Sequence, residues 1–338
     1  MTIRIAINGF GRMGRLALRE VWDSNLVEIV HINEIACDAH SSAHLVNFDS
    51  AHGRWWHEAK TDGDTIVIGD KRIGYSMNKH IAETDWASLN VDVVIECTGK
   101  FRTKDMLQAY LDQGVPQVIV AAPMKEGIKN IVMGINDEVF QAGKDPIITA
   151  ASCTTNCIAP VIKVMQEQIG IKHGMITTMH NLTNTQKVVD HGHADLRRAR
   201  ASFESLIPTT TGSATAIGTI FPELNGKLNG VAVRVPFMNA SLTDLVLEMN
   251  REISVNEVNG LLQKAAETYL HGILGFESRP LVSADFEGEH CSSVIDGLST
   301  MVVNGTQVKI LAWYDNEIGY VARMMELAIK VAEMNRAV

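Results

Sequence analysis

Short apolar runs separated by helix-like segments fill the first 150 residues of the chain. Four of these runs have the length and continuous apolarity of strands that are buried on both faces. They lie at 3–7, 27–32, 91–99 and 117–123. The segment 104–113 has helical periodicity, and strands that alternate with helices favour a doubly wound parallel sheet. Turn residues divide the stretch 51–77, which we interpret as a small inserted hairpin.

The pattern changes after residue 150. An apolar run at 146–149 leads into a helical pattern from about 155 to 168, and Gly170 marks its end. Two more helices are expected, at 255–270 and 319–334. Further strands are expected at 175–179, 231–235, 242–249 and 307–313. This arrangement predicts a second, α+β domain with an antiparallel sheet.

A glycine-rich turn follows the first predicted strand. Gly9, Gly11 and Gly14 form the pattern G-x-G-x-x-G before a helix, and Glu34 ends the next strand, about twenty residues further on. The glycines allow a tight turn and let a pyrophosphate group approach the helix N-terminus, while the acid accepts hydrogen bonds from ribose hydroxyls. The sequence therefore predicts a Rossmann domain that binds a dinucleotide. The negative charge of Glu34 favours NAD over NADP, which carries a 2′-phosphate.

Cys153 lies where the predicted Rossmann domain ends. Ser152 is a suitable N-cap, so Cys153 would occupy the first turn of a helix, where the helix dipole lowers the pKa of a thiol. His180 ends a predicted strand and is the base expected to lie near this thiol. A buried cysteine and a hydrogen-bonded strand-end histidine are the alternatives without catalysis. Cys157 completes C-x3-C with Cys153, but the sequence has no second pair at zinc spacing, so no metal is expected.

Two further features indicate anion binding. The threonine-rich turn at 208–213 can offer hydroxyl and backbone N–H groups, and Arg234 lies on an apolar strand, where it needs a carboxylate or a bound phosphate. The segment 181–205 is too long for a simple connection and indicates a functional or interface loop.

Composition narrows the class of protein. A chain of 338 residues is long for one hydrophobic core, and its net charge of -9 argues against a nucleic-acid-binding surface. No apolar run approaches the length of a membrane span, and the N-terminus goes straight into a strand, without a signal peptide. Five cysteines, an odd number, fit a reducing compartment. We therefore expect a cytoplasmic enzyme, with no nucleic-acid or membrane partner.

Several blocks of the chain resemble phosphorylating glyceraldehyde-3-phosphate dehydrogenase. They are residues 9–15, the block Ala-Ser-Cys-Thr-Thr-Asn-Cys at 151–157, and residues 209–212, 222–230, 234–236 and 313–317. The resemblance covers essentially the whole chain in order. It implies NAD-dependent oxidation of glyceraldehyde 3-phosphate to 1,3-bisphosphoglycerate, a glycolytic reaction, through a thioester on Cys153 with His180 as the base. It also implies a homotetramer with the segment 181–205 at its interface.

The resemblance assigns binding residues as well. NAD would be bound by Gly9, Phe10, Gly11, Arg12, Met13, Gly14, Glu34, Thr98, Gly99, Asn316 and Tyr320. The C3 phosphate of the substrate would be held by Thr183 and Arg234, and the attacking inorganic phosphate by Ser152, Thr154, Arg198, Thr211 and Gly212. The expected fold is α/β, with a Rossmann domain at 1–151, an α+β catalytic domain at 152–317, and a C-terminal helix at 318–338 that packs back on the Rossmann domain.

Three alternatives stay open at this point. Asn33-Glu34 and 193–198 are similar to erythrose-4-phosphate dehydrogenase, although the intact threonine turn favours transfer to phosphate over hydrolysis. The segments 34–36, 99–103, 183–186, 212–217 and 239–244 look like a branch found in bacterial arsenic-resistance clusters, where arsenate replaces phosphate and gives 1-arseno-3-phosphoglycerate. An inactive NAD-binding scaffold is the alternative of another class. Glu34 stands where aspartate is commoner in glycolytic members, which bears on cofactor affinity.

Overall fold

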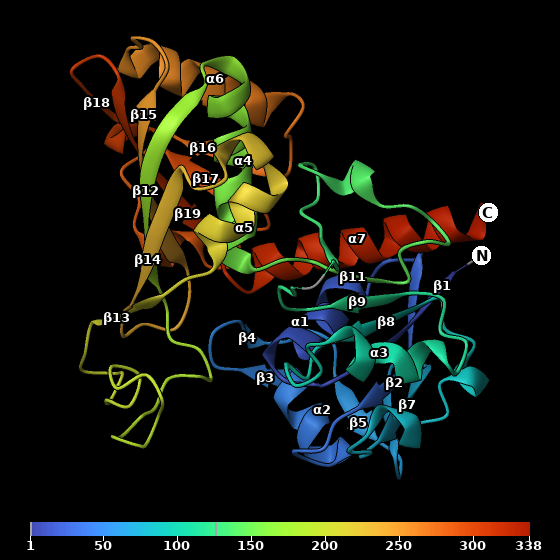
Figure 1. Ribbon diagram of the computed structural model, residues 1–338. Coiled ribbons are helices and arrows are strands. Elements are labelled where there is room, and N and C mark those ends of the chain that lie inside the picture. Colours follow the sequence, from blue (N-terminus) through green and yellow to red (C-terminus); the bar gives the residue numbers. More distant parts are fainter. Residues whose placement is uncertain (1, 126) are drawn as a thin grey trace. The chain divides into compact units, whose positions relative to one another are not determined.

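The computed structural model describes residues 2–125 and 127–338, and its chain forms two compact units (Figure 1). The first unit contains the chain up to Ser152 together with Val321–Val338, and the second contains Cys153–Tyr320. Each unit has its own sheet, and none of the helices in the described residues is long and apolar enough to cross a membrane.

The sheet of the first unit has nine strands in the order β10-β11-β9-β8-β1-β2-β7-β6-β5. These strands are β1 (Ile3–Asn8), β2 (Val27–Asn33), β5 (Ala59–Thr61), β6 (Thr65–Ile68), β7 (Lys71–Ser76), β8 (Val93–Glu96), β9 (Val118–Val120), β10 (Lys129–Asn130) and β11 (Ile147–Thr149). The pairs from β10 to β7 are parallel, which confirms the doubly wound sheet. The hairpin prediction for 51–77 was incomplete, because β6 pairs antiparallel with both β5 and β7, and β7 pairs with β2 and so extends the main sheet.

The helices of the first unit connect its strands. They are α1 (Arg12–Val21), α2 (Ala39–Asn47) and α3 (Lys104–Leu111), with short 3-10 turns η1 (Ile81–Glu83), η2 (Ala87–Leu89) and η3 (Asp137–Val139) and a small ribbon of β3 (Phe48–Asp49) and β4 (Gly53–Arg54). The C-terminal α7 (Ile318–Arg336) belongs to this unit from Val321 onward. The last turns of α7 are tied to this unit. Asn335 donates to Gln117 Oε1 at 3.0 Å, and Arg336 donates to Asp92 Oδ2 at 2.7 Å.

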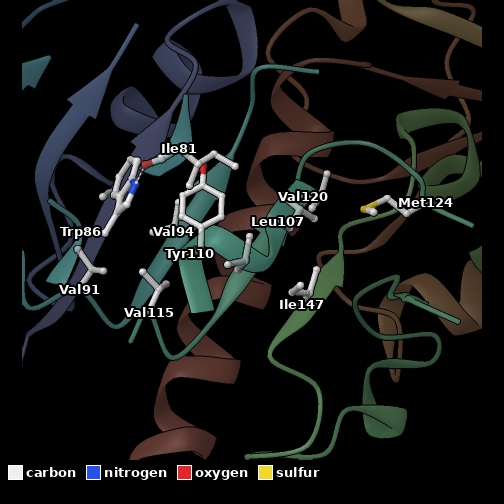
Figure 2. Packing of buried hydrophobic residues seen from close by; sticks show 12 residues of the cluster. Ile81, Trp86, Val91, Val94, Leu107, Tyr110, Val115, Val120, Met124 and Ile147 are labelled. Atoms are coloured by element: carbon white, nitrogen blue, oxygen red, sulfur yellow. Dashed lines mark hydrogen bonds between the residues drawn. The ribbon is translucent and has the colours of Figure 1, made fainter. Parts of the chain in front are cut away.

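A cluster of buried apolar side chains fills the space beside β8 and β9 (Figure 2). Trp86 and Tyr110 meet edge to face at 5.2 Å between ring centroids, and the indole N–H of Trp86 donates to the carbonyl oxygen of Ile81 at 2.7 Å. Both rings are buried, and the hydroxyl of Tyr110 donates to Glu96 Oε2 at 2.7 Å. The aromatic rings thus stabilise the first unit by burial while their polar ends stay hydrogen-bonded.

The second unit is built on a mixed, mostly antiparallel sheet in the order β13-β14-β12-β15-β19-β17-β16, with β18 beside β19. Its strands are β12 (Ile171–His180), β13 (Ile207–Thr210), β14 (Leu228–Arg234), β15 (Ser241–Met249), β16 (Leu274–Glu277), β17 (Ser293–Asp296), β18 (Met301–Val303) and β19 (Gln307–Tyr314). The pairs β12–β14 and β16–β17 are parallel and the others antiparallel. The predicted α+β architecture is therefore confirmed.

One face of this sheet is covered by helices (Figure 1). These are α4 (Cys153–Gln168), α5 (Ser213–Ile220) and α6 (Val255–Glu267), with 3-10 turns η4 (Pro222–Leu224), η5 (Ser283–Phe286) and η6 (Gly297–Ser299). The strands alternate buried and more exposed positions, as expected for a sheet with one covered face, and Leu245, Leu247 and Ile310 are fully buried. The opposite face and the irregular segment before β13 expose several large apolar side chains.

Candidate active site

The glycine-rich turn between β1 and α1 leaves open space at the start of the helix. Gly9 has a φ of +91°, and a Cβ atom on it would lie 2.5 Å from the backbone nitrogen of Thr98. A Cβ on Gly14 would lie 2.3 Å from the carbonyl oxygen of Gly9. At Gly11, by contrast, a Cβ would meet nothing within 4 Å among the described residues. Close packing therefore requires glycine at positions 9 and 14. Gly11 leaves open space at the N-terminus of the helix, where a pyrophosphate group can bind.

Glu34 follows β2 directly and is held by backbone groups. Its Oε2 accepts from the N–H of Phe10 at 2.7 Å, and its Oε1 accepts from the N–H of Ala36 at 2.8 Å. The first of these bonds joins the acid to the glycine-rich turn. The carboxylate is thus fixed beside the place where a ribose would follow a bound pyrophosphate.

Arg12 and Met13 form the first turn of α1, and Arg12 makes an ion pair with Asp49. Burial alone would raise the pKa of the Asp49 carboxyl, but the hydrogen bond from Arg12 and the N–H groups of His52 and Ala51 lower it to about 2. The carboxylate is therefore ionised at neutral pH and neutralises a guanidinium at the start of the helix.

A buried polar network lies beneath the turn and was not found by sequence reasoning. Glu96, at the end of β8, is 1% exposed. Its Oε2 accepts from Asn8 Nδ2 at 3.0 Å and from Tyr110, while Oε1 accepts from the N–H of Thr98 at 2.8 Å and from the Thr98 hydroxyl. Burial raises the pKa of Glu96, and these hydrogen bonds oppose that shift. The network fixes Thr98 and hence the turn at Gly99, two of the predicted cofactor residues.

In the second unit, Cys153 is the first residue of α4 and His180 the last of β12. The Cys153 Sγ atom lies 3.5 Å from His180 Nε2, within hydrogen-bond reach of a sulfur. Cys153 is partly exposed, whereas His180 is only 5% exposed. The structure thus brings the predicted nucleophile and the predicted base together.

The other ring nitrogen of His180, Nδ1, contacts two groups of opposite character, a carbonyl oxygen that can only accept and a guanidinium that can only donate. Nδ1 lies 2.9 Å from the carbonyl oxygen of Asn181. Arg234 Nη1 donates to the same carbonyl at 3.0 Å and lies 2.6 Å from Nδ1. If Nδ1 carries the proton and donates to Asn181, the Nε2 lone pair faces the thiol. This tautomer is the one that a general base for Cys153 requires.

The ionisation of this pair differs from the sequence expectation. Burial raises the pKa of the Cys153 thiol, against the smaller lowering effects of Arg234 and of the Thr154 hydrogen bonds. The predicted lowering at the helix start is therefore outweighed. Burial, followed by the charge of Arg234, lowers the pKa of His180 to about 3. A proton that passes from sulfur to Nε2 leaves opposite charges in contact, so the two groups titrate as a pair.

Arg234 is placed beside His180 by the register of the parallel strands β12 and β14, where the two residues are direct partners. Burial lowers its pKa, and among the described atoms its buried Nε has no hydrogen-bond partner. A buried guanidinium with a donor to spare suits an anionic ligand. Thr183 is held locally, since its hydroxyl lies 2.9 Å from the hydroxyl of Thr185 and donates to Gln186 Oε1 at 2.9 Å.

The predicted residues for inorganic phosphate lie on three segments. Ser152 precedes α4, and the hydroxyl of Thr154 in its first turn lies 3.0 Å from that of Tyr314. Tyr314 also lies 2.8 Å from the hydroxyl of Thr178, and its ring meets that of His180 edge to face. Tyr314, which the sequence did not reveal, therefore links the start of α4 to the strand that carries the base.

The other two segments flank β13. Arg198 donates from Nε to the hydroxyl of Thr209 at 2.7 Å, and this hydroxyl donates to Asp195 Oδ2 at 3.0 Å. Thr211 donates to the hydroxyl of Ser213 at 3.1 Å, and Gly212 stands at the N-cap of α5. Arg198 and Thr211 are thus each held by a side-chain hydrogen bond.

Two predicted nicotinamide residues lie near the start of α7. Asn316 is 5% exposed, and its Oδ1 accepts from the hydroxyl of Ser241 at 2.9 Å. Asp315 Oδ1 accepts from the N–H groups of Glu317 and Ile318 at 2.8 and 2.9 Å, which caps the helix. Tyr320, in the first turn of α7, is 4% exposed.

Family models match both parts of the chain. Residues 3–104 match the NAD binding domain of glyceraldehyde 3-phosphate dehydrogenase, and residues 152–316 match its C-terminal domain. The chain belongs to the glyceraldehyde-3-phosphate dehydrogenase family. It is 59% identical over 333 residues to glyceraldehyde-3-phosphate dehydrogenase 3 of Nostoc sp., with 98% of this chain and 99% of the relative covered. Glyceraldehyde-3-phosphate dehydrogenase 1 of Bacillus subtilis is 46% identical over 333 residues, and the enzyme of Geobacillus stearothermophilus is 46% identical over 332 residues, with the same coverage.

Membership of the glyceraldehyde-3-phosphate dehydrogenase family confirms several predictions. The resemblance seen in the sequence, the Rossmann domain with a second α+β domain, NAD as the cofactor and an NAD-dependent oxidoreductase are all confirmed. The observations at Gly11 and Glu34 fit this cofactor, since the turn has room for a pyrophosphate group and an acid beside it. The roles of individual site residues stay predictions.

Proposed function

We propose that this chain oxidises glyceraldehyde 3-phosphate to 1,3-bisphosphoglycerate, with inorganic phosphate as the second substrate. The observation that carries the proposal is the contact of 3.5 Å between Cys153 Sγ and His180 Nε2, in a chain that belongs to this family. Nucleotide binding is assigned to 1–151 with the helix at 318–338, and chemistry to 152–317. The names of the relatives support the triose substrate.

The first half of the reaction forms a thioester. His180 Nε2 takes the proton of the Cys153 thiol as sulfur attacks the aldehyde carbon and returns it to the former carbonyl oxygen, which gives a hemithioacetal. Bound NAD supplies an acceptor for the hydride that leaves this carbon. His180 assists removal of the hydroxyl proton, so the carbon becomes the carbonyl of a thioester on Cys153. Arg234 and Thr183 are proposed to hold the C3 phosphate during these steps.

The second half transfers the acyl group. Inorganic phosphate, held by Ser152, Thr154, Arg198, Thr211 and Gly212, attacks the thioester carbon. The carbon–sulfur bond breaks, and the sulfur leaves as the thiolate or takes back a proton from His180. Positive charge from arginine stabilises the two anions that must come together. Arsenate has nearly the same shape as phosphate, so the same groups would accept it and give 1-arseno-3-phosphoglycerate.

We further propose that the protein works as a homotetramer. Apolar side chains are exposed on the sheet face opposite the helices of the second unit. Met175, Val246 and Met301 lie there in one row across β12, β15, β19 and β18, with the charged Lys309 between Val246 and Met301. Met175 is 66% exposed and Met301 is 54% exposed. The segment 181–205 adds Val188, Val189 and Leu196, each at least 69% exposed. Such surface supports association between copies. The five cysteines all lie in the described part of the chain and form no disulfide there, which suits a reducing compartment such as the cytoplasm.

NADH formation, followed by its absorbance, tests the function. Glyceraldehyde 3-phosphate and erythrose 4-phosphate are compared, each with phosphate or arsenate. The proposal expects the triose with phosphate to give the highest kcat/KM, with loss of activity after alkylation of Cys153. Preference for the tetrose would favour erythrose-4-phosphate dehydrogenase, and NAD binding without turnover of either aldehyde would favour a scaffold. Preference for arsenate would favour the arsenic branch.

A further inference from the structure

A buried hydroxyl in the second unit determines how the Asn316 amide is presented. Ser241 is fully buried at the first position of β15 and donates to Asn316 Oδ1 at 2.9 Å. The Ser241 oxygen also accepts from the backbone N–H of Asn181, the residue after His180, at 3.2 Å. Because this N–H can only donate, the hydroxyl proton of Ser241 stays available for the bond to Asn316 Oδ1.

Only one end of the Asn316 amide is then available to a ligand. A side-chain amide has an oxygen that accepts and an NH2 group that donates. Ser241 engages the oxygen, and within residues 2–125 and 127–338 the Nδ2 group has no hydrogen-bond partner, although Asn316 is only 5% exposed. The Nδ2 group is therefore the end of the amide that can donate to a ligand.

The backbone on both sides of this contact is tightly held. Asp315 is 1% exposed, and its Oδ2 accepts from Asn239 Nδ2 at 2.7 Å and from the N–H of Gly288 at 2.8 Å. Ala240, directly before Ser241, has a φ of 59°, a conformation unfavourable for a residue with a Cβ. The backbone next to Ser241 is thus strained, and the backbone next to Asn316 is fixed by hydrogen bonds of Asp315.

We propose that Ser241 is a positioning residue that holds Asn316 with its Nδ2 group towards the ligand. The site then recognises the carbonyl oxygen of the nicotinamide substituent and not its NH2 group. This inference rests on the proposed function, since it requires NAD to be the ligand. It goes beyond that function because it names Ser241 as the residue that decides which end of the Asn316 amide faces the ligand.

Calorimetric binding of three probes to the full-length protein tests the proposal without any turnover. The probes are NAD, the 3-acetylpyridine analogue of NAD, which keeps the carbonyl oxygen but replaces NH2 by a methyl group, and ADP-ribose, which lacks the ring. Ser241→Ala is compared with the matched control Ser293→Ala. Ser293 is also fully buried in this sheet, but its hydroxyl contacts Cys157.

The expected result is that Ser241→Ala weakens the binding of NAD and of the acetylpyridine analogue by the same factor, roughly 3–10-fold. The affinity for ADP-ribose should not change. Ser293→Ala should change none of the three. If only the binding of NAD weakens, Asn316 contacts the NH2 group of the nicotinamide and the proposal is wrong. If the binding of ADP-ribose weakens by the same factor, Ser241 has only a structural role, which also overturns the proposal.

Two controls separate other outcomes. Failure of the unsubstituted protein to bind NAD would contradict the proposed function itself, whereas equal NAD binding by Ser241→Ala and the unsubstituted protein would contradict only this inference. Should Ser241→Ala not fold, Ser241→Cys keeps a weaker donor of similar size and must show the same pattern to a smaller extent.

Discussion

Replacement of His180 by asparagine tests the pairing of thiol and imidazole most directly. The substitution removes the Nε2 atom that lies 3.5 Å from Cys153 Sγ, while a polar side chain remains at the buried position. Without that base, attack on the aldehyde depends on thiolate formed by solvent. Activity should therefore fall, and it should become strongly dependent on pH.

The structure sets a lower bound for the loss. The ordinary pKa of a cysteine is 9.0, and burial raises that of Cys153 further. At pH 7 a thiol with a pKa of 9 is about 1% ionised, so the loss should reach at least about 100-fold. General base catalysis contributes up to about 10⁴-fold, which gives a range of about 3–5 kcal/mol in activation free energy.

Two assays check this prediction for His180→Asn. The rate of NADH formation should rise about tenfold per pH unit between pH 7 and pH 9, because each unit increases the thiolate fraction tenfold. Alkylation of Cys153 by iodoacetamide, which needs no substrate, should shift to higher pH. His173 lies on the same strand but is exposed, so His173→Asn is a matched control that should change neither measurement. An unchanged alkylation profile in His180→Asn would refute the pairing.

Three further predictions concern other residues. Gly9→Ala should lower the Tm and abolish NAD binding measured by calorimetry, because its φ is positive and its Cβ would meet Thr98; an unchanged Tm would contradict this. Tyr314→Phe should raise the KM for phosphate several-fold but leave the KM for the triose unchanged in steady-state assays, since the lost hydroxyl contacts Thr154; equal changes in both would count against it. Asp49→Asn should lower stability by about 2 kcal/mol at neutral pH in denaturant titrations. The pKa of Asp49 in the folded protein is lowered to about 2, so the difference in unfolding free energy from the unsubstituted protein should be constant above about pH 4. It should vanish as the pH falls to about 2. A difference that does not change with pH would refute the stabilising role of the Asp49 carboxylate.

Local signals in the sequence revealed the features that depend on neighbouring residues. The glycine pattern placed the turn before α1, and the apolar runs placed His180 at the end of a strand and Cys153 near the start of a helix. Helix α5 was missed, because its threonine, serine and glycine residues resemble a turn more than a helix.

Contacts between distant residues could not be found in this way. Asn8 and Glu96 are 88 residues apart, and Ser241 and Asn316 are 75 residues apart. Each pair meets only because strand order brings it together, and periodicity contains no information on strand order. The direction of the Cys153 pKa shift was wrong for a related reason. A helix start can be predicted from local sequence, whereas burial of the thiol depends on the whole unit.

Backbone strain shows which positions the fold maintains at a cost. Among the described residues, four residues other than glycine have a positive φ, and two of them are Ala151 and Ala240. Both are fully buried, and each stands one or two residues before a proposed functional side chain, Cys153 or Ser241. A left-handed alanine costs about 1–2 kcal/mol, and glycine at either position would remove that cost. Because strain of this kind persists only where surrounding contacts fix the backbone, these two alanines indicate that the start of α4 and the start of β15 are held rigidly. Rigid placement is what a thiol and a positioning hydroxyl need, since an error of about 1 Å in either would weaken the alignment of the reacting groups.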